Sequence, residues 1–170
     1  MSAIDKGNLF LFEEVNDQSA LRLIKCIQYL NTKTKLKEIK LFINSSGGDS
    51  HAGFSLIAVI KRSKKPVTGI VLGTAQSAAL DIFVSTHKRL VSEYAIFMTH
   101  EHTINCSDAS HTEIKSLSGM SRDMSTMARQ LYSDRCKIDG VNYQEFFGTV
   151  PRYFDGDKAI EMGFADGKWK

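Results

Sequence analysis

Residues 39–49 read Ile39-Lys40-Leu41-Phe42-Ile43-Asn44-Ser45-Ser46-Gly47-Gly48-Asp49. The apolar start of this stretch predicts a buried strand, and the glycine pair that follows lets the backbone turn and approach a ligand closely. Apolar residues at helical spacing come next, from Ala52 to Ile60, and Pro66 marks the end of that helix. A strand that leads through a glycine turn into a helix is the unit from which α/β folds are built.

The same unit recurs on both sides of this stretch. We expect further strands over residues 9–12, 67–72, 90–91 and 95–98, and further helices over 17–30, from 77 onward, over 110–136, over 143–147 and over 155–163. Strands that alternate with helices imply βαβ units and a mostly parallel sheet covered on its faces. The sequence contains no linker, repeat or low-complexity segment, so residues 1–170 are predicted to form a single α/β domain.

Composition argues against several classes of protein. Of the 170 residues, 42% are hydrophobic and 24% are charged, which is ordinary for a soluble globular domain. The net charge of +3 is spread along the chain, and its densest basic run, residues 61–65, is typical of a solvated helix end, so we expect no nucleic-acid partner. No segment approaches the roughly 20 apolar residues of a membrane helix. The start lacks a signal peptide, and we therefore expect a cytoplasmic protein with no membrane partner.

The three cysteines, Cys26, Cys106 and Cys136, lack the spacing of metal ligands. Cys26 falls within an apolar helical pattern and is interpreted as a small buried hydrophobic residue. Because the sequence has no Cys-x-x-Cys pair, structural zinc is not expected, and we predict neither a metal nor a cofactor.

Three predicted strand ends carry groups that are suited to acyl transfer. They are the glycine turn at Gly48, the serine at the start of a helix at Ser77, and the histidine that follows a strand at His100. In open α/β sheets, functional groups gather at the carboxyl ends of the strands. A serine can attack a carbonyl, a histidine can accept its proton near neutral pH, and backbone N–H groups can stabilise the oxyanion.

Each of these signals has a simpler interpretation when it is taken alone. Serine is a preferred helix cap, and a glycine pair after a strand usually makes only a turn. A single histidine at a strand end is more often structural than catalytic. The hypothesis of an acyl-transfer site therefore depends on the three signals occurring together and in this order.

Four segments resemble motifs of one peptidase family. In that family the motifs read Ile-Asn-Ser-Pro-Gly-Gly with a later Ala-Gly, Gly-Gln-Ala-Ala-Ser-Met, Met-Ile-His, and Ala-x-Glu-x-Gly-x-x-Asp. The matching segments here are Ile43–Gly48 with Ala52-Gly53, Gly73–Ala78, Met98–His100 and Ala159–Asp166. The chain thus resembles the Clp protease proteolytic subunit, a family of serine peptidases, over nearly its whole length.

The resemblance implies a fold and an assembly. The fold is a crotonase-like α/β fold of repeated βαβ units, from which a handle helix, here about residues 110–136, protrudes. The assembly is a heptameric ring, stacked in pairs as a tetradecamer. Within that chamber, peptide bonds of unfolded proteins would be hydrolysed in an ATP-dependent manner with an AAA+ ATPase unfoldase as partner.

The resemblance also assigns roles to residues. Ser77 would be the nucleophile and His100 the general base, and the N–H groups of Gly48 and Ala78 would form the oxyanion hole. His102 is a rival base, but the Met-x-His spacing favours His100.

The third member of the family's catalytic triad, an aspartate, has no clear counterpart. Alignment without gaps places Pro151 at its position, and a shift of one residue places Arg152 there. Asp155 is a candidate if the loop is rearranged, although its simpler interpretation is the N-cap of the last helix. A catalytic dyad, a relocated aspartate and an inactive site all remain open at this stage.

Other positions also depart from the family pattern. Ala79 replaces a glycine of the family pattern. Asp81 occupies a normally apolar position one helical turn after Ser77. We interpret it either as the partner of a neighbouring basic group or as a participant in the site. Residues 103–108 lack the glycines of the family's substrate-binding strand, and only about eight residues precede the first predicted strand.

Two alternatives to an active peptidase follow. The first is a weak or inactive structural ring subunit of a mixed complex, suggested by Pro151 and by the short amino terminus. The second is an acyl-CoA enzyme of the wider crotonase fold, which would use backbone N–H groups but would not need the serine and the histidine. The fold alone does not decide between these functions.

Overall fold

The computed structural model describes residues 2–33, 35–101, 110–137, 148 and 150–170. The helix predicted over 143–147, the stretch 103–108 and the rival base His102 lie outside the described residues. Within the described part, no helix combines the length and the apolar character that crossing a membrane requires.

A mostly parallel sheet forms the centre of the molecule. Its strands follow the order β1-β2-β3-β4-β7, while β5 pairs with both β3 and β6. The described pairs are parallel except that of β5 with β6, which is antiparallel. The bounds are β1 Asn8–Leu11, β2 Ile39–Ser45, β3 Val67–Gln76, β4 Lys88–Val91, β5 Ile96–Thr99, β6 Arg152–Asp155 and β7 Gly167–Lys168.

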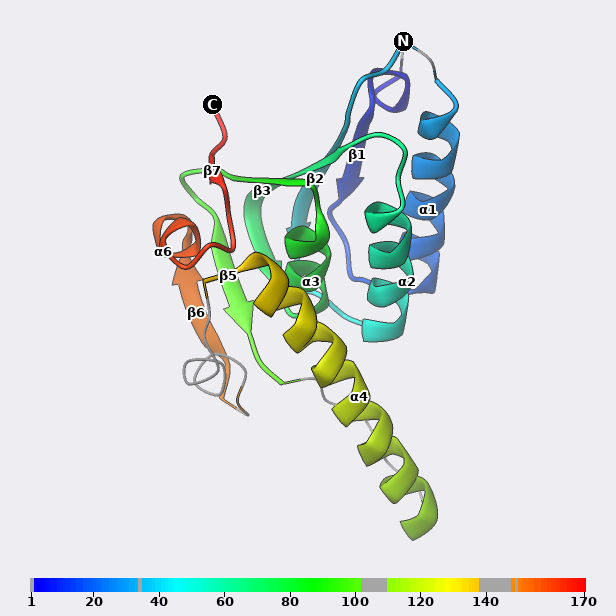
Figure 1. The fold of residues 1–170 in the computed structure, drawn as a ribbon, viewed down its shortest axis with the longest axis vertical. Coiled ribbons are helices and arrows are strands. Elements are labelled where there is room, and N and C mark those ends of the chain that lie inside the picture. The colour runs from blue at the N-terminus through cyan, green and yellow to red at the C-terminus, as the bar shows by residue number, and fades with distance from the viewer. Residues whose placement is uncertain (1, 34, 102–109, 138–147, 149) are drawn as a thin grey trace.

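Three helices pack side by side against this sheet, and a fourth extends away from it (Figure 1). The packed helices are α1, α2 and α3, and the helix that extends away is α4, found where a helix was predicted over 110–136. This arrangement confirms the predicted α/β fold of βαβ units with a protruding helix. The bounds are η1 Ile4–Lys6, α1 Asp17–Asn31, α2 Ser50–Lys61, α3 Ala78–Ser85, α4 His111–Arg135 and α6 Gly156–Glu161.

The local sequence explains why these elements form. Asn16 caps α1 by accepting a hydrogen bond from the backbone N–H of Ser19, and the hydroxyl of Ser19 accepts in return from the N–H of Asn16, so a capping box begins the helix. In β2, alternate residues are buried, and Ile39, Leu41 and Ile43 face the helices within the hydrophobic core.

Strand β3 is four residues longer than the predicted strand over 67–72, and this difference positions the site. Its first half pairs with β2 and β4, and its second half, from Thr74 to Gln76, pairs with β5. The continuation passes through Gly73, where a Cβ atom would lie 2.5 Å from Asn44 Oδ1. Asn44 Oδ1 also accepts a hydrogen bond from the N–H of Thr74 at 3.1 Å. The residues from Gly73 onward, which are typical of a turn in the sequence, are therefore strand, because the Asn44 side chain accepts the hydrogen bond of the Thr74 N–H.

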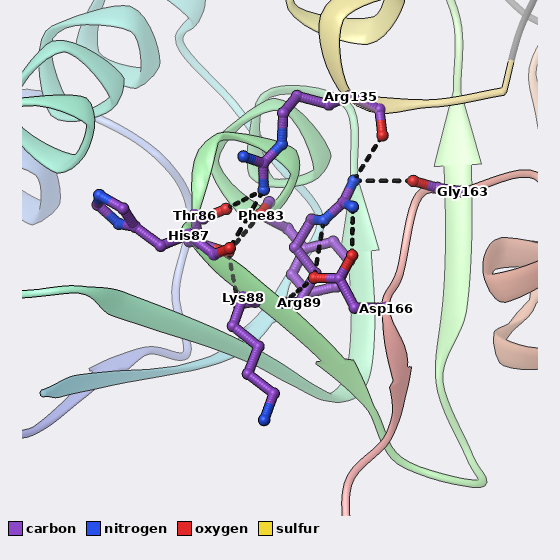
Figure 2. Close-up of polar contacts among 8 residues, drawn as sticks. All are labelled: Phe83, Thr86, His87, Lys88, Arg89, Arg135, Gly163 and Asp166. Atoms are coloured by element: carbon purple, nitrogen blue, oxygen red, sulfur yellow. Dashed lines mark hydrogen bonds and ion pairs between the residues drawn. The ribbon is translucent and has the colours of Figure 1, made fainter.

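Arg89 joins three parts of the chain, which are β4, the end of α4 and the segment before β7 (Figure 2). Its side chain is 7% exposed, forms an ion pair with Asp166, and donates hydrogen bonds to the carbonyl oxygens of Gly163 at 2.8 Å and Arg135 at 3.1 Å. Arg135 in turn donates to the carbonyl oxygen of Thr86 at 2.6 Å. These contacts fix the end of α4 and the segment before β7 against β4.

Basic turns lie together at the amino ends of the parallel strands. The turn after α1 carries Lys33, Lys35 and Lys37, and the turn after α2 carries residues 61–65. Asn31 joins the two turns, because its Oδ1 atom accepts hydrogen bonds from Ser63 Oγ at 3.0 Å and from the N–H of Lys65 at 3.2 Å. We call these two turns the basic edge.

Candidate active site

Ser77 lies at the junction of β3 and α3 in a strained backbone conformation. Its φ of 50° makes it the only described residue other than glycine with a positive φ, and such a conformation costs of order 1–3 kcal/mol. Its N–H donates to the carbonyl oxygen of Met98 at 3.0 Å, and its own carbonyl oxygen accepts from the N–H groups of Leu80 at 2.9 Å and Asp81 at 3.2 Å. The neighbouring strand and the first turn of α3 thus hold the serine in place.

His100 comes from the end of β5, the strand that pairs with the second half of β3. Its Nε2 atom lies 2.8 Å from Ser77 Oγ, at hydrogen-bond distance. The imidazole is half-buried. A serine hydroxyl that donates to an unprotonated ring nitrogen is arranged for proton transfer during attack on a carbonyl.

The glycine turn after β2 lies directly against the serine turn. A Cβ atom on Gly47 would lie 2.5 Å from the carbonyl oxygen of Gln76 and 2.9 Å from Ser77 Cβ, so the position admits no side chain. At Gly48, φ is 141° and a Cβ atom would lie 2.3 Å from the carbonyl oxygen of Val15. Both glycines are therefore required by close backbone approach.

The direction of the Gly48 N–H follows from its pairing. Val15 N–H donates to the carbonyl oxygen of Gly47 at 2.8 Å, and Asp49 N–H donates to the carbonyl oxygen of Val15 at 2.7 Å. In a parallel ladder, a residue bonds to the two neighbours of its partner, so the N–H of Gly48 itself points away from Val15. Gly48 is itself exposed, and its N–H forms no backbone hydrogen bond with the described residues around the turn.

Ala78 supplies a second backbone donor next to the serine. It is the first residue of α3, and the first N–H groups of a helix have no partner within the helix. Ala78 is 1% exposed, and its Cβ atom lies 3.5 Å from the Cβ position of Gly53 on α2. Ser77 Oγ, His100 Nε2 and the backbone N–H of Ala78, which lies beside the Gly47 turn, are therefore close together. Their assignment to an acyl-transfer site stays a prediction.

Comparison with known proteins now assigns the chain to a family. A sequence model of the family described as Clp protease matches residues 1–167. The chain belongs to the Clp protease family.

Individual Clp protease relatives match over nearly the same length. The ATP-dependent Clp protease proteolytic subunit 1 of Chlamydia muridarum is 28% identical over 176 residues, covering 96% of this chain and 86% of the relative. The protein of the same name from Protochlamydia amoebophila is 25% identical over 174 residues, covering 96% and 80%. The ATP-dependent Clp protease proteolytic subunit of Oltmannsiellopsis viridis is 33% identical over 95 residues, covering 55% and 49%.

This Clp protease family member has a proline where the orienting aspartate is expected. The register of the antiparallel pair β5–β6 ends with Thr99 opposite Arg152, so His100 and Pro151 are each the next residue beyond the paired strands. Asp155 lies opposite Ile96, four positions back along β5 from His100 and hence about 13 Å away along the strand. Its carboxylate accepts a hydrogen bond from the N–H of Lys158 at 2.8 Å, which makes it the N-cap of α6. Among the described residues, no hydrogen bond joins His100 to a carboxylate.

Asp81 is buried in the first turn of α3, with 4% of its surface exposed. Its carboxylate accepts a hydrogen bond from the phenol of Tyr132 on α4. Sequence reasoning singled out the aspartate but missed the tyrosine, because Tyr132 belongs to none of the family motifs. The available signal was Asp81 itself, since a carboxylate in an otherwise apolar helix requires a buried polar partner.

The Met98 carbonyl and the contact of Val15 with Gly48 were missed as well, because backbone hydrogen bonds do not depend on the type of side chain.

Proposed function

We propose that the chain is a serine-type endopeptidase subunit that hydrolyses peptide bonds of unfolded proteins. The observation that carries the proposal is the 2.8 Å approach of His100 Nε2 to Ser77 Oγ at a strained turn after a parallel strand. Membership of the Clp protease family supports it.

The mechanism uses the chain's own residues. Ser77 Oγ attacks the peptide carbonyl carbon while its proton passes to His100 Nε2, and the carbonyl becomes an oxyanion bound by the N–H groups of Gly48 and Ala78. His100 then gives the proton to the leaving amine as the C–N bond breaks, which leaves an acyl ester on Ser77. Water attacks this ester, His100 accepts the water proton and returns it to Ser77 Oγ, and the carboxylic acid product leaves.

The site works as a dyad in this proposal. Because no carboxylate among the described residues bonds to His100, we expect turnover to be lower than in a complete triad, where loss of the aspartate alone costs about 10⁴-fold. The oxyanion donors remain, and each such donor contributes about 2.7–4 kcal/mol to lowering the barrier.

The assembly is part of the proposal. The relatives bear the name of an ATP-dependent protease subunit. We accordingly propose a heptameric ring, stacked in pairs and supplied with unfolded polypeptide by an AAA+ ATPase.

A fluorophosphonate probe tests the nucleophile directly. We expect the purified chain to become covalently labelled, and peptide mapping by mass spectrometry to place the label on Ser77. Ser77→Ala should abolish labelling, and His100→Ala should slow it strongly. Absence of labelling in an assembled, folded protein would contradict the proposal and would favour a structural ring subunit instead.

A further inference from the structure

Asp81 and Arg89 are the two charged side chains that are buried among the described residues. Arg89 is accounted for by its ion pair with Asp166 and by the carbonyl oxygens around it. Asp81 lies in a helix whose eight residues are all buried, where an apolar side chain would avoid the desolvation of a carboxylate. Its presence calls for a function that an apolar residue would not perform.

Tyr132, the hydrogen-bond donor to the Asp81 carboxylate, is held firmly in the core. The buried residues of α4 are confined to its second half, and they are Met124, Ala128, Leu131 and Tyr132. The Tyr132 ring is 2% exposed and packs against Phe164 with ring centroids 5.5 Å apart. The phenol is therefore held by the part of α4 that is anchored in the core.

Asp81 connects this fixed point to the serine turn. Its side chain accepts from Tyr132, and its backbone N–H donates to the carbonyl oxygen of Ser77 at 3.2 Å. A residue with φ of 50° keeps that conformation only where the surroundings over-determine it. The first turn of α3 is one of the two segments that bond to the Ser77 backbone, and the other is β5 through Met98.

We propose that Asp81 and Tyr132 form a positioning pair that holds the start of α3, and with it the Ser77 hydroxyl, in the geometry needed for attack. The inference rests on the proposed function, because it concerns the reactivity of the same serine. Neither residue touches the reacting atoms. Loss of the bond lets the start of α3 shift, and a displacement of about 1 Å at a reacting group can cost 10²-fold in rate.

Three variants and one control test the pair. Tyr132→Phe removes the donor and keeps the ring, Asp81→Leu removes the acceptor, and Asp81→Asn keeps an acceptor oxygen. The control, Asp166→Asn, weakens the ion pair of Asp166 with the buried Arg89 (Figure 2), at a position outside the two segments that bond to the Ser77 backbone. For each variant, the measurements are the maximal rate of fluorophosphonate labelling, the probe concentration at half-maximal rate, and the urea midpoint of unfolding.

We expect Tyr132→Phe and Asp81→Leu to lower the maximal labelling rate at least about tenfold with little change in the half-maximal concentration. Asp81→Asn should retain most of the rate, because its amide oxygen still accepts from the phenol. Asp166→Asn should lower the urea midpoint and leave the labelling rate within about twofold of wild type. The double variant Asp81→Leu/Tyr132→Phe should be no slower than the slower single variant, because the two residues act through one bond.

Hydrogen exchange supplies a readout that does not depend on the chemistry. Exchange of the Leu80 and Asp81 amides should be faster by about tenfold or more in Tyr132→Phe than in Asp166→Asn. Unchanged labelling and unchanged exchange in a folded Tyr132→Phe protein would overturn the inference. If the wild-type chain is not labelled at all, the proposed function fails, and the exchange comparison still decides whether the pair holds the start of α3.

Discussion

At the scale of single residues, backbone conformation and cross-strand position decide the chemistry. Ser77 combines φ of 50° with ψ of −127°, a region that glycine occupies far more readily than serine. His100 directly follows the last paired residue of β5, and Pro151, which directly precedes the first paired residue of β6, provides no acceptor from its side chain. Under the proposed function, the first feature positions the nucleophile, and the second limits how firmly its base is oriented.

Pro151→Asp should raise the reactivity of Ser77. Pro151 directly precedes Arg152, and the partner of Arg152, Thr99, directly precedes His100, so we expect an aspartate at this position to come within reach of the imidazole. We expect fluorophosphonate labelling to be at least about tenfold faster, in the direction of the roughly 10⁴-fold effect of an orienting aspartate. Pro151→Asn is the matched control, and equal gains in both variants would show that removal of the proline, rather than the carboxylate, is responsible.

Ser77→Gly should be more stable than Ser77→Ala by about 1 kcal/mol. Both variants lack the nucleophile, but only glycine adopts the observed φ without strain. Urea unfolding of the two proteins measures the difference. Equal midpoints would mean that the backbone relaxes when the hydroxyl is removed.

At the scale of elements, the site depends on how strands and helices meet rather than on any one of them. β3 pairs with β4 in its first half and with β5 in its second half, and this change of partner brings His100 beside Ser77. The contacts of Arg89 fix β4, the end of α4 and the segment before β7 together.

The ion pair of Arg89 with Asp166 should make the free energy of unfolding depend on pH. Burial acts to raise the pKa of Asp166, but hydrogen bonds from Arg89 outweigh it, and the net pKa lies below its ordinary value. Because the folded-state pKa is lower than the unfolded one, the contribution to stability is complete above the unfolded pKa and is lost as the pH falls through the folded pKa. Urea midpoints of wild type should thus fall more steeply below about pH 4 than those of Asp166→Asn. Parallel pH profiles of the two proteins would contradict this assignment.

At the scale of the whole molecule, charge is distributed unevenly. The basic edge carries residues 33–37 and 61–65 at the amino ends of the strands, whereas the proposed catalytic groups lie at the carboxyl ends. No described carboxylate forms an ion pair with a lysine or arginine of these two turns. Mutual repulsion of these side chains acts against the folded state.

Lys64→Glu should therefore stabilise the folded chain at low ionic strength, by no more than about 0.5 kcal/mol. The gain should shrink as salt is added, because exposed charges are screened beyond about 10 Å at 0.1 M salt. Lys115→Glu, on the exposed part of α4, is the control and should give no such gain. Thermal unfolding at 20 mM and 500 mM NaCl measures both effects, and a gain that does not depend on salt would have another cause.

The elements and site residues that could be predicted from the sequence are those marked by a pattern of side chains. Apolar periodicity predicted α1, β2 and the helix found at His111–Arg135, and family motifs predicted the partners Ser77 and His100. The extension of β3 was missed because Gly73 is typical of a turn, whereas the carboxamide of Asn44 supports it as strand. Strand β6 was missed for a related reason, since its four residues gain their order from pairing with β5. Tyr132 was missed because its role comes from a contact 51 positions away in the sequence.

The hydrogen-bond partners described for Ser77 all come later in the chain than the serine itself. The Met98 carbonyl, the His100 imidazole and the Tyr132 phenol each follow it in order of synthesis. A polypeptide emerging from the ribosome therefore carries the serine before it carries anything that could activate or orient it. If Ser77 is the nucleophile, we therefore expect the chain to stay unreactive towards a fluorophosphonate probe until translation has passed Tyr132.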